Sequence, residues 1–139
     1  MRSANGASGT SSSVLDASAL IALLYGEPGG DRVADALDRG AAISTVNLAE
    51  VVGRLSDAGV QEAVIASLLA PLRLAVFDFD IPAAFHTGLL RPLTRAAGLS
   101  LGDRACLALA HHLGVPALTT DRNWEAVQNA VGVRVELLR

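Results

Sequence analysis

The chain has 139 residues and one cysteine, which excludes a disulfide-stapled fold and predicts a single domain of ordinary size. Its formal net charge of -3 excludes a protein that holds nucleic acid by bulk positive charge alone, and all 11 basic residues are arginine, which removes lysine-based chemistry. Although 51% of the residues are hydrophobic, no uncharged apolar run approaches the roughly 20 residues of a spanning helix, so we expect no membrane segment and a cytoplasmic protein.

The first half of the chain alternates short apolar runs with helical periodicity. Residues 1–12 are small, polar and without periodicity, which predicts a flexible tail, either natural or left over from expression, ahead of one domain at 13–139. Apolar spacing and Gly or Pro stops then predict strands at 14–16 and 41–44 and helices at 17–25, 31–37, 46–58 and 60–70.

The second half continues the alternation. The run 74–79 is rich in aromatic and branched residues and predicts a strand, with Asp78 and Asp80 as polar positions along it. A helix is expected at 82–91, kinked or restarted at Pro92, and Cys106 is expected in the core within the most apolar helix. The remaining elements are predicted as helices at 103–113 and 123–130 and strands at 117–120 and 133–137. This order predicts an α/β fold with a mainly parallel sheet covered on both faces.

Four acidic residues stand at the ends of predicted strands or in the first turns of the helices that follow: Asp16, Glu50, Asp103 and Asp121. Because these positions meet at the carboxyl edge of a parallel sheet, we expect the four carboxylates to face one crevice. Like charges about 4 Å apart repel by about 4 kcal/mol at an effective dielectric near 20, so such a cluster must protonate or bind cations. Oxygen ligands favour Mg²⁺ or Mn²⁺, which can activate water against a phosphodiester.

Helix capping is the alternative explanation for each acid taken alone. Asp16 and Asp121 are preferred residues at a helix N-terminus, and Glu50 and Asp103 stand three residues after Asn47 and Ser100 in the spacing of a capping box. A similar choice arises for the nearby hydroxyls of Ser18 and Thr119, which either orient a carboxylate or a metal-bound water or bond to local backbone.

The segments VLDASALIALL, ISTVNLAEVV, LSLGDRACLALA and LTTDRNW resemble the successive acidic motifs of PIN-domain ribonucleases, above all the VapC-type toxins of toxin–antitoxin pairs. The resemblance implies a PIN-like three-layer α/β/α sandwich with five strands and Mg²⁺- or Mn²⁺-dependent endonucleolytic cleavage of RNA. It assigns metal binding and catalysis to Asp16, Glu50, Asp103 and Asp121, with Ser18 and Thr119 in support. It also implies an antitoxin partner and a homodimer. Asn123 departs from the pattern, because many relatives carry a further acid there.

Other polar and aromatic residues carry weaker signals. Arg104 and Arg122 flank two of the acids and are candidates for contacts with the RNA backbone, although a solvated arginine is the commoner case. His111 and His112 end a helix, where a histidine needs no ligand to be favourable. Trp124 is expected to pack in the core or at an edge rather than to stack on a base.

Two other functions fit parts of the pattern. A phospho-acceptor receiver domain also combines strand-end aspartates, Mg²⁺ and a parallel sheet, but it requires a late lysine and the chain has none. A degenerate PIN fold could bind RNA or a protein without cleaving, and the presence of all four acids argues against it. A metal-dependent endoribonuclease is therefore the leading prediction.

Overall fold

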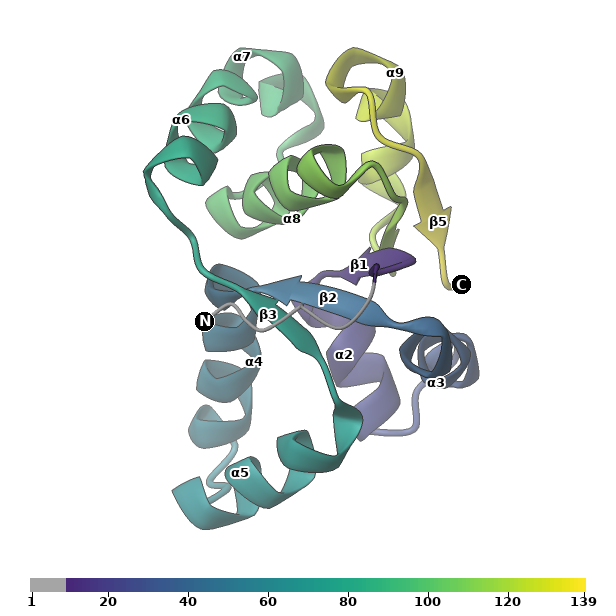
Figure 1. Ribbon diagram of the computed structural model, residues 1–139, viewed down its shortest axis with the longest axis vertical. Helices are drawn as coiled ribbons and strands as arrows, with labels where there is room; N and C mark the ends of the chain where they lie inside the picture. The colour runs from purple at the N-terminus through teal and green to yellow at the C-terminus, as the bar shows by residue number, and fades with distance from the viewer. Residues whose placement is uncertain (1–9) are drawn as a thin grey trace.

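Five parallel strands form the central sheet of the computed structural model, which describes residues 10–139. They lie in the order β3-β2-β1-β4-β5 (Figure 1). Their bounds are β1 Ser13–Leu15, β2 Ala41–Ser44, β3 Ala75–Phe77, β4 Ala117–Thr119 and β5 Val135–Leu137. The chain builds outward from β1 in one direction through β2 and β3, then returns to the other side of β1 with β4 and β5. The switch between β1 and β4 is where open α/β sheets place ligands.

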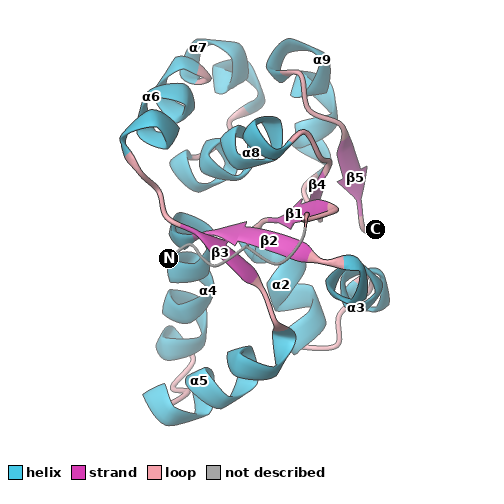
Figure 2. Cartoon of the chain, viewed as in Figure 1, coloured by secondary structure: helices cyan, strands magenta, loops and turns pink. Residues whose placement is uncertain are grey.

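Helices cover both faces of the sheet (Figures 1 and 2). One layer contains α2 Ala17–Leu24, α3 Gly30–Arg39, α4 Thr45–Asp57 and α5 Glu62–Leu69. The other contains α6 Ile81–Leu89, α7 Arg91–Thr94, α8 Leu101–Leu113 and α9 Gln128–Val131. Short 3-10 turns are η1 Ala70–Leu72, η2 Arg95–Ala97 and η3 Arg122–Val127. The predicted three-layer α/β/α sandwich with a parallel five-stranded sheet is confirmed.

Alternate residues of each strand point into two separate cores, as the pleat requires. In β1, Val14 packs with the core under α8, whereas Leu15 packs with the core over α2 and α4. Strands β2 and β4 divide in the same way. Burial on both faces explains why these strands read as continuous apolar runs, and it fixes the register that carries the strand ends to one edge.

The segment after β3 differs from the sequence prediction. The strand ends at Phe77, so the interpretation of Asp78 and Asp80 as polar positions along a strand is wrong. Asp80 caps α6, its Oδ1 accepting from the backbone N–H of Ala83 at 2.9 Å. A capping aspartate followed by Pro82 in the first turn begins a helix more favourably than it extends a strand.

Smaller differences concern the tail and the last predicted helix. Residues 1–9 of the predicted tail lie outside the described residues, and Ser12 donates its N–H to the carbonyl of Gly40 at 2.8 Å. The helix expected at 123–130 is a 3-10 turn followed by one turn of α9. Trp124 and Cys106 are fully buried, as predicted. Within residues 10–139, no helix has the length and apolar character needed to cross a membrane.

Candidate active site

Asp16 is a buried carboxylate at the end of β1, with 4% of the residue exposed. Its Oδ1 accepts from the N–H of Ala19 at 2.8 Å, so it caps α2. The Ser18 hydroxyl donates to the same carboxylate, 2.8 Å from Oδ1 and 3.0 Å from Oδ2. The Thr119 hydroxyl donates to Oδ2 at 2.6 Å from the end of β4. Asp16 therefore caps α2, and at the same time the hydroxyls of Ser18 and Thr119 orient its carboxylate.

The same hydroxyls join the two strand ends across the switch point. Ser18 Oγ accepts from the N–H of Thr120 at 3.0 Å, and Thr119 Oγ1 accepts from the N–H of Asp121 at 3.1 Å. Each hydroxyl thus accepts from backbone and donates to Asp16. This network fixes the direction of the Asp16 carboxylate and the position of Asp121, two residues after the end of β4.

Asp103 lies in the first turn of α8, and Asp121 is the N-cap residue of η3. Asp103 forms a capping box with Ser100, in which its Oδ2 accepts from the Ser100 N–H at 2.9 Å and its own N–H donates to Ser100 Oγ at 3.2 Å. Asp121 Oδ1 accepts from the N–H of Asn123 at 2.9 Å. Both acids therefore cap as the alternative explanation predicted, and each keeps carboxylate lone pairs free for another partner.

Glu50 is not part of a capping box, because α4 is capped by Ser44. Instead the buried Asn47 amide donates to Glu50 Oε1 at 2.9 Å and to the carbonyl of Gly102 at 3.0 Å. A Cβ at Gly102 would lie 2.6 Å from Glu50 Cδ. Only glycine at this position therefore lets the Glu50 carboxylate pack against α8. Asn47 and Gly102 thus position Glu50 between α4 and α8.

The sequence prediction paired Asn47 with Glu50 only as a capping box and did not single out Gly102, although signals for both positioning roles exist. Asn47 and Glu50 are three residues apart on one helix, which puts their side chains on the same face. Gly102 stands inside a helix, where glycine costs about 1 kcal/mol relative to alanine, so its presence indicates a close approach by another group.

Electrostatic effects show that the acids share one region. Burial raises the pKa of Asp16 from 3.8 to about 6 despite the hydrogen bonds that favour its charge, and the charge of Asp103 raises it further. Burial likewise raises the pKa of Asp103, with a contribution from the charge of Asp121. The thiol of Cys106, beneath the cluster on α8, has its pKa raised by burial first and then by Asp16, Asp103 and Glu50.

The donor set fits a hard divalent cation. Asp16 is buried without a cationic side chain bonded to it, and all four acids offer only oxygen ligands. The absence of a side chain at Gly102 leaves space for the carboxylate of Glu50. Among residues 10–139, however, no three His, Cys, Asp or Glu side chains are already grouped to hold a metal ion. The carboxylates therefore share a region without yet forming a closed coordination cage.

The two arginines beside the acids lie in different surroundings. Arg104 is buried, and its Nη1 donates to the carbonyl of Thr87 at 3.0 Å, which joins α8 to α6. Its charge lowers the pKa of Asp103, against the larger effect of burial. Arg122 is exposed in η3 and is the better placed of the two to meet a ligand from solvent.

Comparison with known proteins identifies a matching family and solved structures with a similar fold. A family model described as the PIN domain matches residues 13–130. No curated protein sequence matches. Among solved structures, DNA-bound VapBC from Salmonella typhimurium aligns with a TM-score of 0.70 at 23% identity, covering 91% of this chain and 98% of that one.

Two other solved structures align equally well. A toxin-antitoxin complex from Klebsiella pneumoniae gives a TM-score of 0.70 at 19% identity, covering 92% of this chain and 98% of that one. VapBC2 from Rickettsia felis, bound to a DNA fragment from its promoter, gives 0.70 at 20% identity, with 90% and 97% covered. At these identities the alignments establish a shared fold.

Proposed function

This chain belongs to the PIN-domain family, and on that premise we propose that it is a Mg²⁺- or Mn²⁺-dependent endoribonuclease of the cytoplasm, the toxin of a toxin–antitoxin pair. The observation that carries the proposal is the buried Asp16 carboxylate, held by two hydroxyls and coupled electrostatically to Asp103. A buried acid that lacks a compensating cation is typical of a functional site rather than of a structural cap.

The four acids, Asp16, Glu50, Asp103 and Asp121, would hold the ion. When bound, it supplies a water nucleophile at neutral pH and neutralises charge on the phosphodiester. Ser18 and Thr119 keep the Asp16 carboxylate fixed in one direction, and Asn47 does the same for Glu50. Arg122 is proposed to contact the RNA backbone. Arg104 supports the site from within, by joining α8 to α6.

A cognate antitoxin is the proposed protein partner. Support comes from the structural neighbours, which are VapBC and toxin-antitoxin complexes. The acidic cluster itself favours a partner segment that brings positive charge to it, since such a segment would offset the repulsion among the carboxylates. We therefore propose that the antitoxin inhibits cleavage by covering these acids.

A second copy of this chain is the other proposed partner, docked through α6. Ile81, Phe85 and Leu89 follow one another at helical spacing and are 79%, 72% and 68% exposed. The helix Ile81–Leu89 contains no Asp, Glu, Lys or Arg, so two copies of an acidic protein can meet there without charge repulsion. Such an apolar stripe is typical of an interface, and a two-fold axis would bring it against itself.

Replacing Phe85 by aspartate is expected to convert a dimer into a monomer, because two carboxylates would face each other near the axis. The fold should persist, since the Phe85 side chain is exposed. Light scattering coupled to size-exclusion chromatography measures the mass, and circular dichroism checks the fold. Tyr25→Asp, at an exposed aromatic in the opposite layer, should stay dimeric. A monomeric wild-type protein, or a dimeric Phe85→Asp variant, would contradict this surface.

The test of the enzymatic proposal is cleavage of structured RNA by the purified chain. We expect defined new RNA ends in the presence of Mg²⁺ or Mn²⁺, and no cleavage in excess EDTA, since the ion supplies the nucleophile. Calorimetry with each ion measures metal binding separately. If the chain retained RNA but neither bound a divalent ion nor cut, it would be a binding module of the PIN fold instead.

A further inference from the structure

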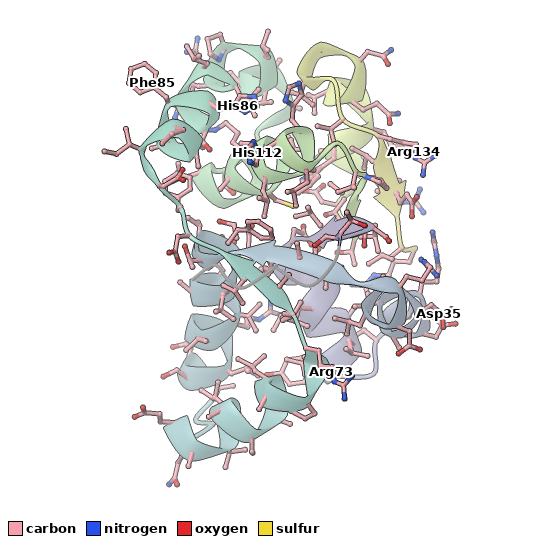
Figure 3. The ribbon with its side chains drawn as sticks, in the orientation of Figure 1. Asp35, Arg73, Phe85, His86, His112 and Arg134 are labelled. Carbon is pink, nitrogen blue, oxygen red and sulfur yellow. The ribbon has the colours of Figure 1, made fainter. Side chains whose placement is uncertain are left out.

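A cavity of about 230 Å³ lies between α6 and α8, the helix that carries Asp103, and the proposed function assigns it no role. Its walls include Phe77 at the end of β3, the residues 78–80 that follow it, and the side chains of His86 and His112. In Figure 3, His86 and His112 lie between α6 and α8, whereas Phe85 points away from the molecule. The cavity is therefore separate from the exposed stripe of α6.

Three structural links tie this cavity to the acids. Helix α8 carries Asp103 in its first turn and lines the cavity with Ala105, Ala108, Leu109 and His112. At 1.5 Å per residue, the rise from Asp103 to Leu109 is about 9 Å. Ser44, which also lines the cavity, ends β2 next to β1. The N–H of Phe79 donates to Thr45 Oγ1 at 3.0 Å, which anchors the loop to the helix that carries Glu50.

The lining suits a flat heterocycle. Phe77, Phe79, His86 and His112 bring four rings to a small space, and unpaired RNA bases commonly stack on such side chains. Burial lowers the pKa of His86, with the neighbouring His111 and His112 adding to the effect, which favours the neutral imidazole. A neutral ring offers a face for stacking without attracting a second phosphate.

The carboxylates of Asp78 and Asp80 in the lining favour a heterocycle that presents hydrogen-bond donors. Asp80 uses Oδ1 to cap α6, whereas no group within residues 10–139 donates to the Asp78 carboxylate. A carboxylate has two acceptor oxygens and, when ionised, no donor. Guanine presents two adjacent N–H donors on its Watson–Crick edge. Adenine, cytosine and uracil each place a ring or carbonyl acceptor beside a donor on that edge, which would face the carboxylate unfavourably.

We propose that this cavity binds a guanine base of the RNA substrate, stacked between the rings and paired through its Watson–Crick edge with Asp78. The inference rests on the proposed ribonuclease function, which brings single-stranded RNA to this edge of the sheet. It assigns guanine preference near the cleavage point to Asp78, and it makes His86 and His112 the walls that hold the base.

Binding of the four nucleoside 5′-monophosphates to the full-length chain in EDTA tests this inference without requiring metal or catalysis. We expect GMP to bind about tenfold more tightly than AMP, CMP or UMP, the ratio that one bidentate base contact supports. It should also shift the imidazole NMR signals of His86 and His112. Asp78→Asn should remove the preference for GMP, whereas Asp35→Asn, an exposed acid on α3 (Figure 3), should keep it.

The following binding results would overturn the inference. Equal affinity for the four nucleotides, GMP signals that move only away from the cavity, or the same result for Asp78→Asn and Asp35→Asn would each exclude guanine recognition by Asp78. Displacement of GMP by an arginine-rich peptide with tighter binding would assign the cavity to a protein partner. A chain that binds GMP as expected but never cuts RNA would instead refute the proposed function, which keeps the two failures apart.

Discussion

Replacing Asp16 by asparagine is expected to lower the rate of RNA cleavage at least about 10²-fold, because even the outer partners of a metal ligand are worth 10–100-fold. Asparagine caps helices as well as aspartate does, so α2 should remain in place. The oxygen can still accept from Ala19 N–H, but the second negatively charged oxygen, which faces Thr119, is lost. Cleavage of structured RNA with Mn²⁺, compared with wild type, measures the effect.

The same substitution is expected to stabilise the metal-free protein at neutral pH. The pKa of Asp16 is raised from 3.8 to about 6 in the folded state, so the folded chain binds a proton more tightly than the unfolded chain. Wild-type stability should therefore fall as the pH rises from about 4 to about 6, by about 3 kcal/mol once Asp16 is fully ionised. The asparagine side chain of the Asp16→Asn variant carries no charge and should remove this fall.

Urea unfolding in EDTA at pH 4 and pH 7.5 measures this difference in the free energy of unfolding. Asp35→Asn, at an exposed position, is the matched control and should stay within about 0.5 kcal/mol of wild type. An Asp16→Asn variant that cleaves RNA at the wild-type rate would eliminate the proposed mechanism. Lower stability of that variant at neutral pH would show that the carboxylate is a structural cap after all.

Replacing Gly102 by alanine is expected to separate activity from stability. An added Cβ would lie 2.6 Å from Glu50 Cδ, and the carboxylate, as the far end of a flexible side chain, would move rather than the helix. Alanine is favoured over glycine inside a helix by about 1 kcal/mol, so the fold should be as stable as wild type or more so. Misplacement of a reacting group by about 1 Å can cost 10²-fold, and we expect cleavage to fall by about that factor.

Gly53→Ala is the matched control, since Gly53 lies inside α4 and a Cβ there would meet nothing within 4 Å. It should gain a similar stability and keep full activity. Thermal unfolding and RNA cleavage are measured on both variants. Full activity of Gly102→Ala would mean that Glu50 does not need its present position, which would remove Glu50 from the proposed metal site.

The fold was predictable because its strands are buried on both faces. Runs such as Val14–Leu15 and Ala117–Thr119 are too short for helices, and the helices between them imply parallel crossovers. The segment after β3 was not predictable in the same way. Phe77, Asp78, Phe79 and Asp80 alternate apolar and polar residues, which suits a strand until the capping of α6 by Asp80 competes with it.

The positions of the acids and of the hydroxyls Ser18 and Thr119 around Asp16 were predictable from the sequence, but the tertiary contacts of Asn47 and Arg104 were not. The positions of Asp16 and Asp121 follow from where strands end, which apolar runs indicate directly. The Asn47 contact with Gly102 spans 55 positions in the sequence, and no local pattern specifies a tertiary hydrogen bond. The burial of Arg104 was likewise not predictable from the local sequence, since its contact with Thr87 depends on how α6 packs over α8. The metal-binding roles of the four acids stay a prediction.

The hydrogen bond from the Thr119 hydroxyl to Asp16 also limits when the site can assemble during translation. It joins residues 103 positions apart, so Asp16 leaves the ribosome long before its partner exists. At about 5–20 residues per second, the interval is about 5–20 s. Throughout it, the growing chain lacks β4, Asp121 and the strand pairing that orders the end of β1. A ribosome translating this message therefore carries a chain in which the surroundings of Asp16 stay unassembled until synthesis is almost complete.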